Sequence, residues 1–239
     1  MCNRVLGLVA VLGFGLFSCS SVPSAAPQTL ERSDVPEGIN DNFLDTELDP
    51  EMWETRWEVE SREVFACRDD IVKTMELKAG DRIVDVGAGT GLYLVPFAEA
   101  VGESGLVYAA DISPRFIDHL GARKVEENLT NVRVHASSEA SIDLPEGSID
   151  AAYVCDTYHH FEYHRAMLAS LHSSLTSGGK LIIVDFNRIE GKSREWIMGH
   201  VRAGKDQVRA EVEEAGFKFV EEVTLPGLEE NYYLRFRKP

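Results

Sequence analysis

Short apolar runs rich in β-branched residues alternate with amphipathic stretches from about residue 82 onward. Each run is too short for a buried helix and is bounded by glycine or polar turn residues, which is typical of a buried strand. Strands that alternate with helices predict a mostly parallel sheet with helices on both faces, a doubly wound α/β fold. We expect these strands at Arg82–Gly89, Gly105–Ile112, Asn131–Ser137, Ser148–Asp156 and Gly178–Phe186.

Two further strands are expected near the C-terminus, after a helical stretch at 194–216. They cover 217–225 and 231–237, and Pro226 and Gly227 between them are turn residues, which favours antiparallel pairing. The sheet would then have seven strands with an antiparallel last strand. Pro50 suits the first turn of a helix and opens a helical stretch to about residue 77. We therefore place one domain at 50–239.

The N-terminus has a different character. Arg4 precedes an unbroken apolar run at Val5–Phe17, which indicates a secretory signal too short to span a bilayer. Leu16–Cys19 resembles a bacterial lipobox. This implies a lipoprotein signal peptide at 1–18, lipid on Cys19 and a place in the cell envelope, with the outer membrane favoured over the inner. An uncleaved anchor, or a buried helix of a cytoplasmic protein, is the alternative.

Residues 19–49 are rich in Ser, Pro, Ala and acidic residues, which predicts a flexible tether. The whole chain carries a net charge of -16, and this disfavours nucleic acid as a partner because phosphate neutralisation needs Lys and Arg. The lipid anchor, by contrast, would make a bilayer a partner of the chain. Cys67 and Cys155 are interpreted as two separate thiols, although an oxidising compartment would allow them to pair.

Three glycines alternate in Val84–Gly91, between a predicted strand and a predicted helix. Such glycines allow positive φ and a close approach of a ligand to the backbone. A dinucleotide-binding fingerprint would need a third glycine where Leu92 stands, and no Gly-Lys-Ser/Thr of a phosphate loop follows. The loop therefore matches neither of these two phosphate-binding motifs.

With its flanks, this loop resembles motif I of the class I S-adenosylmethionine-dependent methyltransferases, in which an acidic residue precedes alternating glycines. The resemblance extends over about 53–237. It implies that Asp85 and the glycines hold the methionine part of the cofactor and that Asp111 binds the ribose hydroxyls. Ser138 or Glu139 would contact the adenine amino group. The implied cofactor site is Asp85, Gly87, Gly89, Gly91, Asp111, Ile112, Ser138, Glu139 and Asp156.

The stretch VCDTYHHFEYH starts at the carboxyl end of the fourth strand, where ligands bind in a doubly wound sheet. Asp156 would lie near the methionine amino group. His159 or His160 is suited to act as a general base, since a neutral imidazole accepts a proton at ambient pH. Tyr158 could line the acceptor pocket.

The region after the fifth strand commonly covers the acceptor pocket in this family. Here it contributes Trp196, His200 and Arg202. Trp196 is predicted to contact the substrate, His200 is a second-choice base, and Arg202 could hold an anionic acceptor.

A metal site from His160, His164 and either Asp156 or Cys155 is chemically allowed. Its spacing matches no strong metal motif, so we predict no metal ligand. The leading hypothesis is methyl transfer from S-adenosylmethionine to a small molecule. The competing hypothesis is an envelope lipoprotein with this fold that binds an adenosyl ligand or a metal without turnover. The export signal keeps it open, because S-adenosylmethionine is made in the cytoplasm.

Overall fold

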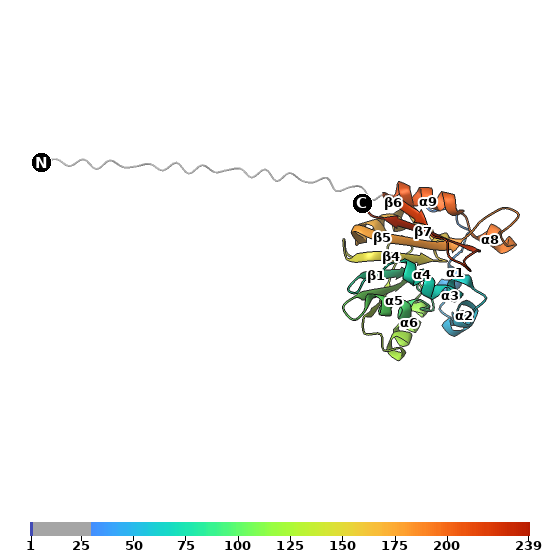
Figure 1. Cartoon of the computed structure of the whole chain (residues 1–239), viewed down its shortest axis with the longest axis horizontal. Coiled ribbons are helices and arrows are strands. Elements are labelled where there is room, and N and C mark those ends of the chain that lie inside the picture. Colours follow the sequence, from blue (N-terminus) through green and yellow to red (C-terminus); the bar gives the residue numbers. More distant parts are fainter. Residues whose placement is uncertain (2–29) are drawn as a thin grey trace.

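The structure is a computed structural model that describes Met1 and residues 30–239 (Figure 1). The signal peptide predicted at 1–18, the lipidation of Cys19 and the first part of the predicted tether lie outside the described residues, apart from Met1.

A seven-stranded sheet forms the centre of the fold, with strand order β3-β2-β1-β4-β5-β7-β6. β7 pairs antiparallel with both β5 and β6, while the β1–β5 neighbours pair in parallel. This confirms the predicted doubly wound sheet. The strands are β1 (Arg82–Val86), β2 (Leu106–Asp111), β3 (Val132–Ala136), β4 (Ile149–Cys155), β5 (Leu175–Phe186), β6 (Lys218–Glu222) and β7 (Asn231–Arg237).

Helices cover both faces of this sheet, and each face has its own apolar core. Leu94 and Phe97 pack with Ile83 and Tyr153 on one face. Leu168 and Val212 belong to the second core, on the other face. The covering helices are α4 (Arg68–Thr74), α5 (Leu94–Val101), α6 (Pro114–Glu126), α7 (His164–Ser174) and α9 (Lys205–Glu214).

Short helices gather near the carboxyl ends of the parallel strands, and Figure 1 shows α1–α3 and α8 at the same end of the molecule. The helical stretch expected at 50–77 is interrupted between α2 and α3. Tertiary ion pairs accompany the break, since Glu58 at the end of α2 pairs with Arg123 and Arg62 before α3 pairs with Asp156. These elements are α1 (Asp41–Leu44), α2 (Pro50–Trp57), α3 (Glu63–Ala66), the 3-10 turn η1 (Tyr158–His160) and α8 (Glu195–His200).

Residues 30–49 pack against the domain, which differs from the tether predicted for 19–49. The backbone N–H of Ser33 donates to the carbonyl of Glu162 at 2.6 Å, and Nδ2 of Asn40 donates to the carbonyl of His160 at 3.2 Å. Val35, Ile39 and Leu48 are buried. The average composition of the segment is polar, but these three apolar residues are buried against the domain, and this offsets part of the cost of ordering the chain.

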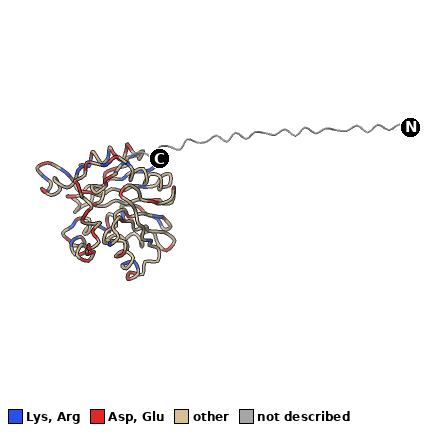
Figure 2. Tube along the Cα trace, turned by 180° about the vertical axis from the view of Figure 1, so that it is seen from behind, with Lys and Arg blue, Asp and Glu red and all other residues tan. Residues whose placement is uncertain are grey.

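No helix of the described part of the chain is long and apolar enough to cross a membrane. Acidic residues are distributed over several helices and loops (Figure 2). Cys67 and Cys155 are both free thiols, as interpreted from the sequence.

Candidate functional site

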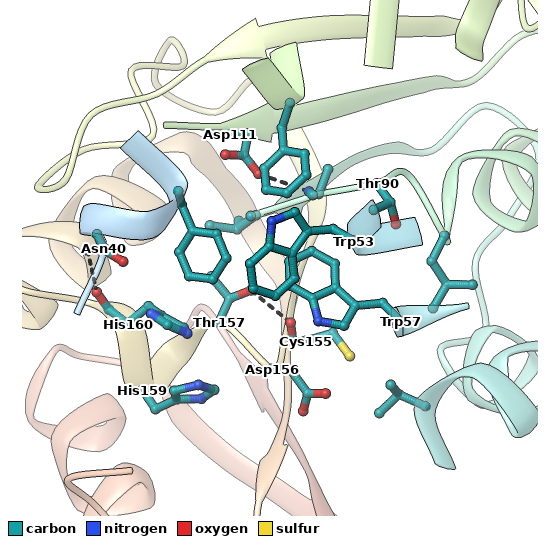
Figure 3. A pocket seen from close by; sticks show the side chains of 18 of the residues that line it. Asn40, Trp53, Trp57, Thr90, Asp111, Cys155, Asp156, Thr157, His159 and His160 are labelled. Atoms are coloured by element: carbon teal, nitrogen blue, oxygen red, sulfur yellow. Dashed lines mark hydrogen bonds between the residues drawn. The ribbon is translucent and has the colours of Figure 1, made fainter. Parts of the chain in front are cut away.

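A cavity of about 700 Å³ opens at the carboxyl ends of β1, β2 and β4. The glycine loop after β1 forms its floor, and η1, α8 and the α1–α3 segment contribute side chains around it (Figure 3). In doubly wound sheets this is where ligands bind, because neighbouring loops diverge there to opposite faces.

The glycine loop presents bare backbone to this cavity. The backbone φ angles of Gly87 and Gly89 are 72° and 54°, values that residues with a side chain rarely adopt. A Cβ on Gly87 would lie 2.5 Å from a side-chain carbon of Thr157, and one on Gly89 would lie 3.1 Å from the ring of Trp57. Gly91 also has positive φ but does not line the cavity, and its Cβ would press on Leu94, so the structure gives it a packing role.

Two buried carboxylates lie beside the loop. Asp111 accepts hydrogen bonds from the backbone N–H of Gly89 at 2.9 Å and of Ser113 at 2.8 Å (Figure 3). Burial raises the pKa of Asp111, although these hydrogen bonds oppose the shift. Burial, reinforced by the charge of Asp111, raises the pKa of Asp85 to about 8. Both groups line the cavity, where a donor or cation on a ligand would relieve the cost of burying them.

The predicted adenine-side residues Ile112, Ser138 and Glu139 also line the cavity. Ser138 and Glu139 are exposed, and the hydroxyl of Ser138 donates to the carbonyl of Ser141 at 3.3 Å. The carboxylate of Glu139 therefore remains the more available acceptor of the two for a ligand.

Asp156 lines the cavity but already has protein partners. Its carboxylate forms an ion pair with Arg62 and accepts a hydrogen bond of 2.6 Å from Nδ2 of Asn231. Burial raises its pKa to about 6, against the opposing charge of Arg62. We predicted that Asp156 lies near a cationic amino group; the structure supplies that cation from the protein, just before α3.

Aromatic rings from the N-terminal segment and from α6 stand over the glycine loop, and no sequence pattern predicted them. The rings of Trp53 and Trp57 lie 4.7 Å apart, Phe43 lies 5.3 Å from Trp53, and Phe116 lies 5.7 Å from Trp57. Figure 3 shows the two indoles extending across the middle of the cavity. Large planar apolar surfaces are therefore available to a ligand bound on the loop.

Three histidines form one wall of the cavity, which we call the histidine wall. His159, His160 and His200 each bring one side-chain nitrogen into a group in which all nitrogens lie within 4.8 Å of one another. Nδ1 of His159 lies 2.7 Å from Oδ1 of Asp185, and both residues are buried. Nδ1 of His160 is buried with no hydrogen-bond partner among the described residues.

Burial and the neighbouring charged groups shift the pKa values of the three rings. Burial, with the neighbouring rings of His159 and His200, lowers the pKa of His160 well below its usual value. Burial also lowers the pKa of His200, helped by His159. For His159 burial acts in the same direction, but the carboxylate of Asp185 outweighs it and the pKa is raised. Asp185 was not predicted as a site residue. The sequence signal that could have found it is its position as an acidic residue at the carboxyl end of the predicted fifth strand.

The three predicted substrate contacts have different outcomes. Trp196 lines the cavity, and its ring meets that of Phe186 at 4.9 Å. Tyr158 and Arg202 are absent from the lining, contrary to prediction. Tyr158 is 1% exposed and donates to Glu211 at 2.7 Å, and Arg202 makes two bonds of 2.7 Å to the same carboxylate. Glu211 on α9 therefore draws both side chains into the core.

His164 does not join the histidine group. Its Nδ1 lies 2.6 Å from the hydroxyl of Ser33, and its Nε2 lies 3.9 Å from Glu211. The metal alternative built on His160 and His164 is therefore not assembled in this structure.

Comparisons with known proteins fit this geometry. The family model of a methyltransferase domain matches residues 83–179. A demethylmenaquinone methyltransferase of Geobacillus sp. (strain WCH70) is 25% identical in an alignment of 183 positions, which covers 64% of this chain and 78% of that protein. In sequence, residues 83–179 are therefore similar to a methyltransferase domain.

Solved structures show the same fold. A SAM dependent methyltransferase from Aquifex aeolicus has a TM-score of 0.70 and 24% identity, over 79% of this chain and 98% of that one. A possible exported protein from Bordetella parapertussis has a TM-score of 0.58 and 15% identity, over 72% of this chain and 67% of that one.

Proposed function

We propose that this protein is an S-adenosylmethionine-dependent methyltransferase with a small-molecule acceptor. One observation carries the proposal: bare backbone at Gly87 and Gly89 lies beside the buried carboxylates of Asp85 and Asp111, on the floor of a 700 Å³ cavity. The loop geometry fits a cofactor whose chain passes close to the backbone. The carboxylates fit its cationic amino group and its ribose hydroxyls.

Each residue then has a defined part in binding. Asp85 would meet the amino group, and Asp111 would accept from the ribose hydroxyls while two backbone N–H groups hold it in place. Ile112 and Glu139 would border the adenine. When bound, the cofactor supplies an electrophilic methyl group on a sulfonium. The protein contributes by holding the acceptor in line with it and by excluding water.

The histidine wall is placed to receive the acceptor's proton. His159, His160 and His200 line the cavity, and Asp185 fixes the ring of His159 through Nδ1. A ring nitrogen that faces the cavity can accept the proton as the acceptor atom attacks the methyl group. The lowered pKa values of His160 and His200 keep both rings neutral and able to accept a proton, and His200, whose pKa is lowered less, is the stronger base of the two.

The aromatic rings beside the histidine wall indicate a planar, largely apolar acceptor. Three rings that line the cavity lie against these histidines, with centroids 5.2 Å apart for Phe43 and His160, 5.7 Å for Phe186 and His159, and 6.1 Å for Trp196 and His200. Flat aromatic walls bind flat apolar ligands by stacking. The Geobacillus relative is named for an acceptor of this kind, demethylmenaquinone. We therefore propose quinone-like or phenolic compounds as the first acceptors to test.

Calorimetry with S-adenosylmethionine and S-adenosylhomocysteine on the purified protein tests the proposal. We expect both to bind, with one site per chain. An exposed carboxylate on α6 offers a matched control: Asp118→Asn should leave affinity unchanged. If neither compound binds, the proposed enzyme is excluded. Binding without methylated product across quinone, phenol, thiol and amine acceptors would favour a non-catalytic adenosyl-binding protein instead.

We also propose that the chain is exported and lipid-anchored through Cys19, in the bacterial outer membrane. The support is the lipobox-like Leu16–Cys19, which follows the apolar run at Val5–Phe17. Metabolic labelling with a fatty acid tests this, with Cys19→Ser as the variant and Cys2→Ser as the control. Label retained in Cys19→Ser, or an unlabelled full-length protein in the cytoplasm, would contradict the anchor.

A further inference from the structure

The histidine wall has an arrangement that a proton acceptor does not require. One imidazole would be enough for a base, yet three rings bring nitrogens within 4.8 Å of one another. The rings come from different parts of the chain, His159 and His160 from η1 and His200 from α8. The centroids of His159 and His200 lie 5.2 Å apart, and those of His160 and His200 lie 5.1 Å apart.

Two further observations distinguish this group from packed aromatic rings. Nδ1 of His160 is buried with no hydrogen-bond partner among the described residues, a costly state that a ligand would relieve. Asp185 binds Nδ1 of His159, which leaves Nε2 of that ring as the free nitrogen. A carboxylate that orients a histidine through its second nitrogen is the usual partner of a metal-binding imidazole.

We propose that His159, His160 and His200 bind a divalent transition-metal ion at the acceptor side of the cavity. A tetrahedral ion with Zn–N distances of about 2.0–2.1 Å places its ligand nitrogens about 3.3 Å apart. From a spread of at most 4.8 Å, the rings need to close by no more than about 1.5 Å, which side-chain rotation provides. Asn40 and Phe43 hold the other side of His160, at its carbonyl and its ring edge, so η1 is already supported.

The ligand set selects the kind of ion. Imidazole nitrogens suit Zn²⁺, Cu²⁺, Ni²⁺ and Co²⁺, whereas Mg²⁺ and Ca²⁺ prefer oxygen ligands. Three protein ligands leave a fourth position open, as in catalytic rather than structural zinc sites. Because all three histidines line the cavity, that position faces the space where an acceptor would bind.

This site goes beyond the proposed methyl transfer and does not depend on it. With an ion bound, the imidazole lone pairs are used as ligands, so the rings no longer act as bases. Coordination to the ion lowers the pKa of a hydroxyl or thiol, as it does for metal-bound water, so the group releases its proton to solvent at a lower pH than when it is free.

Titration of the metal-free, full-length protein with Co²⁺ tests the proposal directly. We expect weak visible bands of a nitrogen-ligated, low-coordinate ion at one equivalent per chain, and their loss on adding Zn²⁺. Mg²⁺ should not compete. An intense thiolate charge-transfer band would instead place the ion on a cysteine and overturn the assignment. If the protein is saturated with Co²⁺ and no new visible band appears, the assignment is overturned as well.

Variants then locate the ion. His200→Ala should abolish the bands, and Asp185→Asn should weaken Co²⁺ binding by about 10–100-fold, since it removes only the orienting carboxylate. His172→Ala is the matched control, because His172 packs against Phe217 away from the cavity. Circular dichroism and thermal denaturation check that each variant is folded. Unchanged Co²⁺ affinity in folded His200→Ala and His159→Gln proteins would refute the site.

Discussion

The side chains of His159 and Asp185 form a buried hydrogen-bonded pair, with Nδ1 of the imidazole 2.7 Å from Oδ1 of the carboxylate. The same carboxylate accepts the backbone N–H of His159 at 3.1 Å and that of Phe186 at 2.7 Å. Asp185 therefore fixes both the turn and the ring. Whether the imidazole acts on a proton or on a metal ion, its working nitrogen is Nε2.

Asp185→Asn should lower methyl transfer while sparing cofactor binding. The amide keeps the shape but loosens the ring of His159, against which the proposed base His160 packs with ring centroids 4.3 Å apart. We therefore expect turnover to fall, by at most the factor of about 10²–10⁴ that is typical of a lost acid–base function. Steady-state kinetics and calorimetry with S-adenosylhomocysteine measure the two effects separately. His160→Ala should likewise reduce turnover with unchanged affinity. A variant that lost turnover and affinity for S-adenosylhomocysteine to the same extent would indicate that the turn η1 itself had unfolded.

Asp111→Asn should weaken the binding of S-adenosylhomocysteine by about 10–100-fold. A charged acceptor contributes about 1.5–3 kcal/mol to a hydrogen bond, and the amide loses the charge. Its one oxygen can still accept from the N–H of Gly89, but its NH2 group then replaces the oxygen that accepts from the N–H of Ser113. Asp118→Asn, on the exposed side of α6, is the control for a lost negative charge. Equal affinity in the Asp111 variant, with its fold intact, would remove this residue from the proposed ribose site.

The carboxyl group of Asp85 should make the ligand-free protein less stable as pH rises. Its pKa is 3.8 when unperturbed and about 8 in the fold, so between these values the folded state holds a proton that the unfolded state releases. The free energy of unfolding therefore falls with rising pH, by at most about 1.4 kcal/mol per pH unit from this group.

Urea denaturation of the wild type and of Asp85→Asn, over about pH 5–8, measures that contribution. The amide does not titrate, so the free energy of unfolding of the wild type should fall relative to that of Asp85→Asn as pH rises. A ligand with a cationic amino group should tighten its binding to the wild type over the same range, because it favours the ionised carboxylate. A difference that does not change with pH would contradict the raised pKa.

The sheet and the glycine loop were predictable because their signals are local. Strands are continuous apolar runs, and the Gly87 and Gly89 positions follow from a motif of adjacent residues. The His159–Asp185 pair and the cover by Trp57 were not predicted, since they join segments far apart in the sequence. Asp185 had a local signal, its place at the end of a strand, but nothing in the sequence named its partner.

The misplaced side chains show where local reasoning fails. Tyr158 and His159 are consecutive in a 3-10 turn, so their side chains point in different directions, one into the core and one into the cavity. Arg202 follows α8, where the predicted single helix breaks and α9 begins at Lys205. That break lets Glu211 reach Arg202, a contact that helical periodicity across an unbroken stretch would not produce.

Glu211→Gln should destabilise the fold by about 3 kcal/mol, because it leaves the nearly buried guanidinium of Arg202 without its charge partner. That side chain is 6% exposed and makes both of its carboxylate bonds to Glu211, which also accepts the hydroxyl of Tyr158. Burial acts to raise the pKa of Glu211, but the bonds from Arg202 and Tyr158 outweigh it and lower the pKa, so this contribution to stability is lost as pH falls toward the folded pKa.

Glu213→Gln, on the same helix, breaks only an exposed pair with Arg209 and should cost at most about 0.5 kcal/mol. Urea denaturation of both variants at neutral pH gives the comparison. Equal stability of the two would mean that Arg202 finds water or another acceptor once Glu211 is neutral.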